Sequence, residues 1–243
     1  MLRLLPLAAI AAIAAFIPAI PQNQLYHAFA DSRTIFGIPN FWNVASNLPF
    51  LIVALYGLKS FRSTTAFKAS WERTAYSLVL FGTAAVSFGS AYYHSHPDDD
   101  HLFWDRLPMA IVFTAIVAST VGERYRGRAG RLLLWPLLAL GIASVFEWRW
   151  TGDLRLYAIV QFGAMAVAIV MVWTHPPLYT EESGIRLLGL FYVLAKLLES
   201  FDAQLGHVLA TGGHPWKHLS AALAMWFYVR AIARRRPVPA SQA

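Results

Sequence analysis

The sequence predicts an all-α integral membrane protein, and three observations carry that prediction. First, 57% of the 243 residues are hydrophobic and only 14% are charged, whereas soluble domains are nearer a quarter charged. Second, apolar stretches approaching the roughly 20 residues that a bilayer-spanning helix needs recur along the whole chain. Third, the polar segments between these stretches are short, which leaves room for one helical bundle and no separate soluble domain.

Eight apolar stretches are expected to form the helices. The first is ambiguous, because Met1-Leu2-Arg3 followed by an apolar run also resembles a signal peptide. The run ends at Phe16–Pro21, which is a poor cleavage site, so a retained helix is favoured. We therefore divide the chain into a hydrophobic segment (1–21), a transmembrane bundle (22–232) and a basic tail (233–243). The expected stretches are roughly 4–20, 42–58, 74–93, 106–122, 132–147, 155–173, 185–201 and 215–232.

The formal charge of +7 does not indicate nucleic-acid binding, because the basic residues follow the membrane topology. Alternating spans place most of them on one side, which the positive-inside rule makes cytoplasmic together with both termini. The tail would then touch anionic headgroups. Basic residues on that side are Arg3, Lys59, Arg62, Lys68, Arg73, Arg124, Arg126, Arg128, Arg131, Arg186, Arg230, Arg234, Arg235 and Arg236; those on the other are Arg33, Arg106, Arg149, Arg155, Lys196 and Lys217.

Three histidines on the non-cytoplasmic side are candidate metal ligands. The chain has no cysteine, so a metal would need His, Asp or Glu ligands. Gly212-Gly213 breaks the chain and Pro215 suits the first position of a helix, so His214 and His218 share one helical face, one turn apart. This spacing presents two imidazoles to one ion, and His94 ends an earlier span at the same face. His96, His101 and His207 are rival ligands in the neighbouring loops.

Two further polar residues lie beside these histidines in sequence. Asp105 precedes Arg106-Leu107-Pro108 and reads either as a helix N-cap or as a group that holds a metal-bound water. Ser90 lies one turn before His94, where it either bonds back to a helix carbonyl or faces the same site. The run Asp98–Asp100 reads as a solvated acidic loop. Lys196 and Glu199, three residues apart within a span, are expected to pair.

Short motifs along residues 25–232 resemble those of the alkaline ceramidase family, within the superfamily of membrane hydrolases that includes the progestin and adipoQ receptors. The set is specific in its order and spacing, although each motif is short. The motifs are Phe41-Trp42-Asn43-Val44-Ala45-Ser46-Asn47, Gly89-Ser90-Ala91-Tyr92-Tyr93-His94, Asp105-Arg106-Leu107-Pro108-Met109, the Asp202 region and Gly213-His214-Pro215-Trp216-Lys217-His218.

The resemblance implies a seven-transmembrane-helix bundle, to which the first segment here is an addition. It also implies Zn2+ held by His94, His214 and His218, with Ser90 and Asp105 beside the reacting water. The expected activity is hydrolysis of the N-acyl bond of ceramide, or of a related N-acyl lipid in the membrane, to a fatty acid and a sphingoid-type amine.

The chain departs from the family near its amino terminus. Eukaryotic members carry an acidic cluster that binds calcium and a Glu before the Phe-Trp-Asn motif. Here Asn40 stands in place of that Glu and Asp31 is the only acid nearby, so the resemblance does not carry calcium over. Short loops and alternating charge suggest a bacterial inner-membrane protein with its site facing the periplasm. The sequence does not fix the oligomeric state.

Three other functions stay open from the sequence. The same site would serve a hydrolase of ester-linked lipids or of another N-acyl amine. A lipid-sensing receptor or small transporter is a non-enzymatic alternative, although no pair of broken helices indicates a transport path. The histidines would also suit haem binding or a proton relay.

Overall fold

The computed structural model describes residues 18–61, 66–125 and 128–239, and its regular elements there are helices. The expected first span, 4–20, lies almost entirely outside the described residues. The elements are η2 (Gln24–His27), α2 (Phe41–Ala45), α3 (Leu48–Phe61), α4 (Ser70–Ser95), α5 (Asp99–Arg124), α6 (Arg128–Thr151), α7 (Arg155–Thr174), α8 (Ser183–Ser200), α9 (Asp202–Leu205) and α10 (His214–Arg234).

Several helices have the length and composition of membrane spans, which makes this an integral membrane protein. Within the described part of the chain five qualify: α2 with α3, then α4, α5, α6 and α7. The helices α8 and α10 lie along the same bundle but carry charged side chains, including Lys196, Glu199 and Lys217. A count of seven spans is therefore an expectation, whereas an all-helical bundle is what the structure has.

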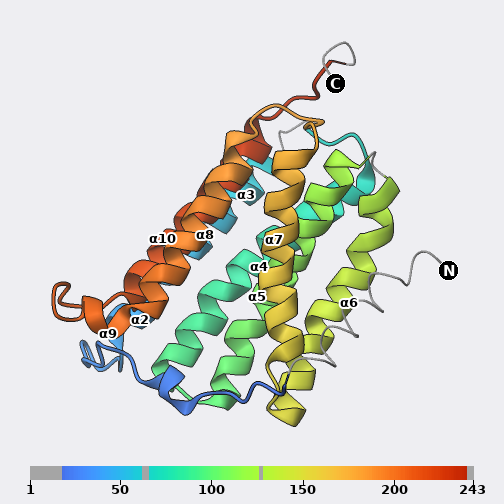
Figure 1. Ribbon diagram of the computed structural model, residues 1–243. Coiled ribbons are helices and arrows are strands. Elements are labelled where there is room, and N and C mark those ends of the chain that lie inside the picture. The colour runs from blue at the N-terminus through green and yellow to red at the C-terminus, as the bar shows by residue number, and fades with distance from the viewer. Residues whose placement is uncertain (1–17, 62–65, 126–127, 240–243) are drawn as a thin grey trace.

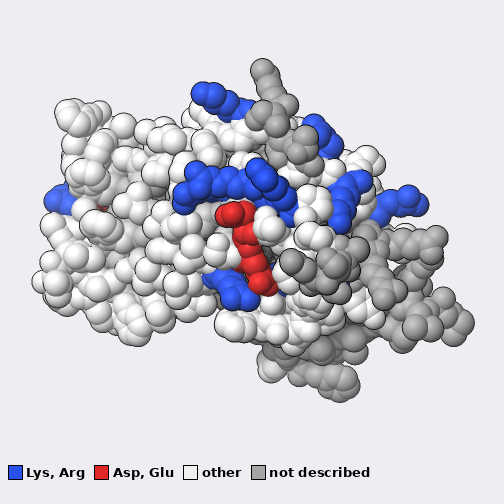
Figure 2. All heavy atoms as spheres, turned by 90° about the horizontal axis from the view of Figure 1, so that it is seen from above, with Lys and Arg blue, Asp and Glu red and all other residues white. Residues whose placement is uncertain are grey.

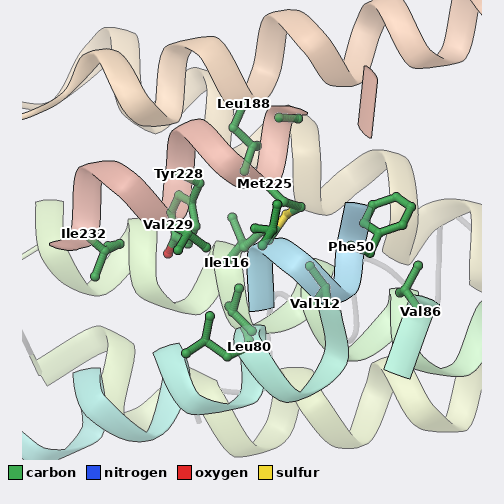
Figure 3. Packing of buried hydrophobic residues seen from close by; sticks show 14 of the residues in the cluster. Phe50, Leu80, Val86, Val112, Ile116, Leu188, Met225, Tyr228, Val229 and Ile232 are labelled. Atoms are coloured by element: carbon green, nitrogen blue, oxygen red, sulfur yellow. The ribbon is translucent and has the colours of Figure 1, made fainter. Parts of the chain in front are cut away.

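The central pair of helices is α4 and α5, which pack against each other along their length (Figure 1). The helices α6 and α7 pack on α5, while α10 packs on α8 and α3. Buried apolar side chains from these elements form the main core, including Leu80 and Val229, which are almost fully enclosed (Figure 3). The end of α4 lies beside the start of α10, where His94 and His218 approach each other.

The two ends of the bundle differ in charge. Figure 2 views the end where α5 and α10 finish, and Lys and Arg side chains there surround a small acidic group. Arg124 pairs with Glu182 at 2.8 Å, and Arg235 pairs with Glu123 at 2.5 Å. The opposite end holds η2, α9 and the first turns of α5 and α10 (Figure 1). All the candidate site residues lie toward that opposite end.

One helix begins earlier than the sequence predicted. Asp98, not Asp105, is the N-cap of α5, and its side chain accepts a hydrogen bond from the backbone N–H of His101. Asp99 and Asp100 lie in the first turn, where acidic side chains are stabilised by the positive end of the helix dipole. The interpretation of Asp98–Asp100 as a loop is therefore wrong, as is the N-cap role for Asp105, which lies within the helix with Pro108.

Candidate metal centre and active site

Three buried histidines form a cluster where the end of α4 meets the start of α10. His94 is fully buried, and His214 and His218 are nearly so. One ring nitrogen from each lies within 4.8 Å of the others. The Nε2 atoms of His94 and His218 are 3.2 Å apart. The structure thus brings together the three residues that the sequence singled out, although His94 lies more than a hundred residues before the other two.

The hydrogen bonds of His218 show which of its ring nitrogens is free to bind an ion. Its Nδ1 lies 2.8 Å from the Ser46 hydroxyl oxygen, and the backbone of Asn43 also interacts with the ring. The Ser46 hydroxyl proton goes to the Asn43 carbonyl at 3.1 Å, so the serine oxygen accepts from the ring. We infer that Nδ1 carries the proton, which leaves the Nε2 lone pair directed at His94. Partners of this kind orient histidine ligands in metal sites.

The spacing of the cluster fits a small divalent cation. Zn–N bonds of 2.0–2.1 Å in a tetrahedron give an N···N edge of about 3.3 Å, close to the 3.2 Å between His94 and His218. Without an ion, at most one proton lies between these two nitrogens. The buried Nδ1 of His94 also lacks a hydrogen-bonding partner among the described residues. The three imidazoles therefore have ring nitrogens available to hold a metal.

A carboxylate from α9 fixes the start of α10. Oδ1 of Asp202 accepts from the backbone N–H of His214 at 2.8 Å, and Oδ2 accepts from Ala30 N–H at 2.9 Å. These bonds satisfy a helix-terminal donor that otherwise has no intrahelical partner. Gly212 has φ +67, a left-handed conformation that favours glycine. The turn and the carboxylate together set where both α10 histidines point.

Ser90 and Asp105 face each other across the α4–α5 contact. The Ser90 hydroxyl donates a hydrogen bond to the Asp105 carboxylate, and both side chains are buried. Gly89 makes this approach possible, because a Cβ there would lie 2.1 Å from the carbonyl oxygen of Trp104. The serine therefore has a partner other than a helix carbonyl, and it lies one helical turn before His94 on α4.

The segment before α2 covers the cluster. The ring of Phe29 lies 4.7 Å from that of His94 and 4.6 Å from that of His214, measured between centroids. Two hydrogen bonds hold this segment down, from Ala30 to Asp202 and between His27 Nδ1 and the Tyr93 hydroxyl at 2.9 Å. Phe29 thus shields the imidazoles from solvent. A single Phe between helices gave no signal in the sequence.

A buried ion network lies beside the histidines. The Glu199 carboxylate pairs with Lys217 at 2.6 Å and with Lys196 at 2.5 Å, and it accepts a hydrogen bond from the Tyr26 hydroxyl at 3.0 Å. The expected pairing of Lys196 with Glu199 is confirmed, and Lys217 joins it. Nζ of Lys217 also lies 3.2 Å from Nε2 of His214. Through Lys217, which contacts His214, the network connects the cluster to a neighbouring cavity.

A cavity of about 480 Å³ opens beside this network, within the range of about 300–1,000 Å³ typical of small-molecule sites. Its deep walls are apolar and come from α4, α5, α7, α8 and α10, including Phe113, Met165 and Met225. Its polar lining includes Tyr26, Arg106, Lys196, Glu199 and Lys217. This lining suits a largely apolar molecule that carries a polar group. Phe113 of α5 lines the cavity, whereas Phe88 of α4 is exposed on the outside of the bundle.

The rival histidines lie outside the cluster. His96 and His207 are exposed, and His101 pairs with Asp98 at 2.7 Å. Asn40, in the position of the family's Glu, donates to the backbone carbonyl of His94 at 2.9 Å. Asp31 is bonded to Arg33 at 2.6 Å, and that guanidinium holds the pKa of Asp31 below its usual value.

Fold and site together define a helical membrane protein with a buried three-histidine cluster, able to hold a metal, and an apolar cavity that reaches the cluster through Lys217. The chain matches the model of the Ceramidase family over residues 34–236, and it belongs to that family. No curated protein matches it. Membership makes the chain a hydrolase of amide bonds with a ceramide-like lipid as its substrate.

Proposed function

We propose that the chain is a zinc-dependent intramembrane amidase that hydrolyses the N-acyl bond of ceramide or a related N-acyl lipid to a fatty acid and a sphingoid-type amine. The observation that carries this proposal is the 3.2 Å approach of the His94 and His218 nitrogens in a buried cluster with His214. The acid–serine pair joins α4 to α5, with Ser90 one helical turn before His94. Family membership supports the same reaction.

His94, His214 and His218 would hold the metal, leaving one coordination position for the reactants. When bound, zinc supplies Lewis acidity and makes water acidic enough to react at neutral pH. No other residue among those described joins the three histidines as a candidate ligand. Asp105 is therefore assigned to proton transfer and not to coordination.

Asp105 would take a proton from the attacking water as the C–O bond forms, and return it to the amine nitrogen as the C–N bond breaks. One water is consumed, and the fatty acid and the free amine leave. In the resting enzyme Ser90 donates to Asp105. Once Asp105 is protonated it accepts this bond less well, which frees the hydroxyl to stabilise the negative charge on the carbonyl oxygen.

The remaining residues prepare the site for an amide within a lipid. The apolar cavity would hold an alkyl chain, and Phe29 would limit entry of bulk water above the histidines. Glu199 fixes Lys217 close to His214, which places a second positive charge near the reacting carbonyl. These side chains position the substrate without contributing to the proton transfers.

The basic end of the bundle supports an orientation. By the positive-inside rule that end faces the cytoplasm, which places the histidine cluster toward the periplasm of a bacterial inner membrane. Because the chain has no cysteine, a single introduced cysteine is the one site in the protein that a maleimide can label. His207→Cys should react with a membrane-impermeant maleimide in intact cells, and Arg236→Cys should react only after lysis. The opposite pattern would reverse the orientation.

Metal content and turnover test the proposal directly. Purified wild-type protein should contain about one zinc per chain and release fatty acid from ceramide in neutral detergent. The double variant His214→Ala/His218→Ala should lose both, whereas His96→Ala and His207→Ala, which change exposed histidines, should keep both. Zinc-free wild-type protein would remove the mechanism. Hydrolysis of a matched ester but not of the amide would instead assign the site to ester lipids.

A further inference from the structure

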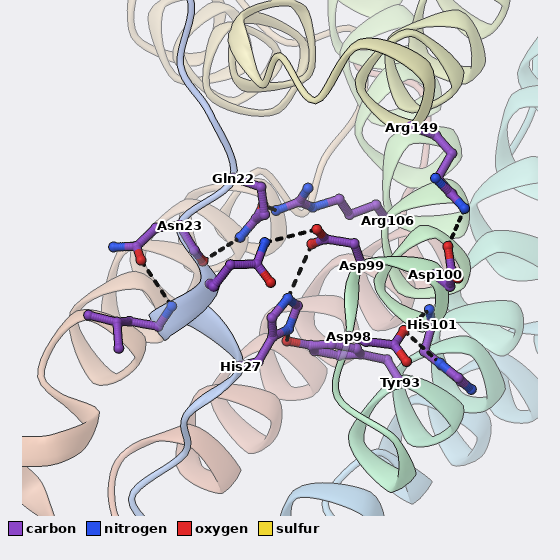
Figure 4. Close-up of polar contacts among 12 residues, drawn as sticks. Gln22, Asn23, His27, Tyr93, Asp98, Asp99, Asp100, His101, Arg106 and Arg149 are labelled. Atoms are coloured by element: carbon purple, nitrogen blue, oxygen red, sulfur yellow. Dashed lines mark hydrogen bonds and ion pairs between the residues drawn. The ribbon is translucent and has the colours of Figure 1, made fainter.

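Arg106 is a buried cation with an unused hydrogen-bonding group. It follows Asp105 in α5, is 5% exposed and lines the apolar cavity. One terminal nitrogen, Nη2, donates to the side-chain oxygen of Gln22 at 2.7 Å (Figure 4). The other, Nη1, is buried and has no hydrogen-bonding partner among the described residues. A buried donor of this kind is costly unless something fills its place.

Aromatic rings hold the guanidinium without satisfying it. Its central carbon lies 4.1 Å from the ring centroid of Trp148 and 5.0 Å from that of Tyr157. Ring faces stabilise the positive charge but accept hydrogen bonds only weakly. The hydroxyl of Tyr157, which lines the same cavity, is also buried and without a partner in the part of the chain that is described. Two unused polar groups thus meet at one wall.

The charge around the cavity is not balanced. Three cations line it, Arg106, Lys196 and Lys217, and Glu199 is the carboxylate that lines it with them. Glu199 bonds to both lysines. No carboxylate among the described residues lies within 4.0 Å of the Arg106 guanidinium. Asp105 also interacts electrostatically with Arg106, which leaves one positive charge of the group without a counter-charge. Buried charges are normally paired, so one more negative charge beside Arg106 would balance the cavity.

We infer that Arg106, with the Tyr157 hydroxyl, binds an oxyanion carried by the lipid in this cavity: a phosphate, sulfonate or carboxylate group. Arginine is suited to such groups because its planar donors match two oxygens at once. Since Arg106 adjoins Asp105, the oxyanion would lie close to the scissile amide. The lipid's being a substrate rests on the proposed function; the binding of the oxyanion does not.

Binding of simple amphiphiles tests the site without requiring turnover. We would titrate purified protein, in a neutral maltoside detergent, with dodecyl phosphate and with dodecanol. Wild type should bind dodecyl phosphate at least roughly tenfold more tightly than dodecanol, as expected for a charge-assisted pair. Arg106→Gln should abolish that preference. Arg106→Lys keeps the charge and loses the planar donors, so it should retain only part of the preference for the phosphate. Residual binding by this variant also shows that its fold is intact.

Arg149→Gln is the matched control, because Arg149 is an exposed arginine at the same end that pairs with Asp100 (Figure 4). It should keep the wild-type preference. Equal binding of the phosphate and the alcohol by wild type, or an unchanged preference in Arg106→Gln, would overturn the inference.

Two amides then identify where the oxyanion comes from. N-dodecanoylglycine and N-dodecanoylethanolamine share the acyl chain and differ in the charge on the amine half. A higher kcat/KM for the glycine amide that disappears in Arg106→Gln would place the oxyanion on the substrate headgroup. Equal rates, with inhibition by dodecanoate that depends on Arg106, would place it on the released fatty acid. Preferential anion binding with no hydrolysis of any N-acyl lipid would leave the anion site standing and remove the proposed function.

Discussion

The close contact between Gly89 and Trp104 makes Gly89→Ala an informative perturbation of the site. The added Cβ would lie 2.1 Å from the Trp104 carbonyl oxygen and 2.9 Å from its carbonyl carbon. Both are backbone atoms of α5, so no side chain can rotate away. The two helices must separate at this level, which is where Ser90 donates to Asp105.

The size of the effect follows from that distance. Moving the contact from 2.1 Å to the 3.0 Å below which real Cβ atoms essentially never approach requires a displacement near 1 Å. Overpacking of this kind costs about 1–3 kcal/mol of unfolding free energy. A misplacement of about 1 Å at a catalytic centre reduces the rate by about a hundredfold. We therefore expect a modest loss of stability and a large loss of kcat.

The assay is fatty-acid release from ceramide, read together with zinc content and thermal unfolding. The matched control is Gly82→Ala, on the same helix and against the same neighbour. Its Cβ would meet the side-chain carbon Cγ2 of Val112 at 2.6 Å, and this group is able to shift. The nearest backbone atom, the Pro108 carbonyl oxygen, would lie 3.2 Å away and has to move by only a few tenths of an ångström. Gly82→Ala should lose some stability yet keep most of its turnover.

The reasoning would be refuted by a Gly89→Ala protein with wild-type kcat and wild-type stability. An equal loss of turnover in both variants would show instead that activity depends on packing along α4 and α5 as a whole, and not on the Ser90–Asp105 contact.

Three further predictions address individual side chains. Asp105→Asn should retain zinc and lose about 10²–10⁴-fold in kcat, the usual contribution of a general base; a variant near the wild-type rate would remove the assigned role. Ser46→Ala should weaken zinc affinity by about tenfold in a chelator competition, because it removes one of the two groups holding His218. Phe29→Ala should leave the fold intact but speed the loss of zinc to a chelator, since this ring covers two of the histidines; an unchanged release rate would contradict the shielding role.

Much of the helical architecture was predictable from apolar runs, but the helix ends were not. The expected segment 74–93 became Ser70–Ser95, and 106–122 became Asp99–Arg124. Both differences extend into polar turns that carry no hydrophobic signal. The first turn of α5 is stabilised by Asp98, which caps the backbone N–H of His101, and at the start of α4 the Glu72 carboxylate accepts from the backbone N–H of Lys68. An apolar pattern contains neither of these local interactions.

The histidine cluster was predictable because its members have a spacing with physical meaning. One helical turn separates His214 from His218, and a helix end supplies His94. The groups that orient and cover them come from distant positions without such spacing. Ser46 and Asn43 were visible only as parts of a motif, and Phe29 is one aromatic residue in a loop. Ser46, Asn43 and Phe29 contact the histidines only because distant segments pack together in the fold. Local sequence patterns do not encode such contacts.

The distance along the chain between His94 and His218, 124 residues, has a consequence for biosynthesis. During translation α4 is made before α10, so His94 is present in the bilayer before His214 and His218 have been synthesised. The cluster closes only when the helices between them have been inserted and α10 has docked on α3 and α8. If the cluster is the catalytic centre that we propose, a nascent or truncated chain is inert toward the lipids around it, and hydrolysis begins only when α10 has joined the bundle.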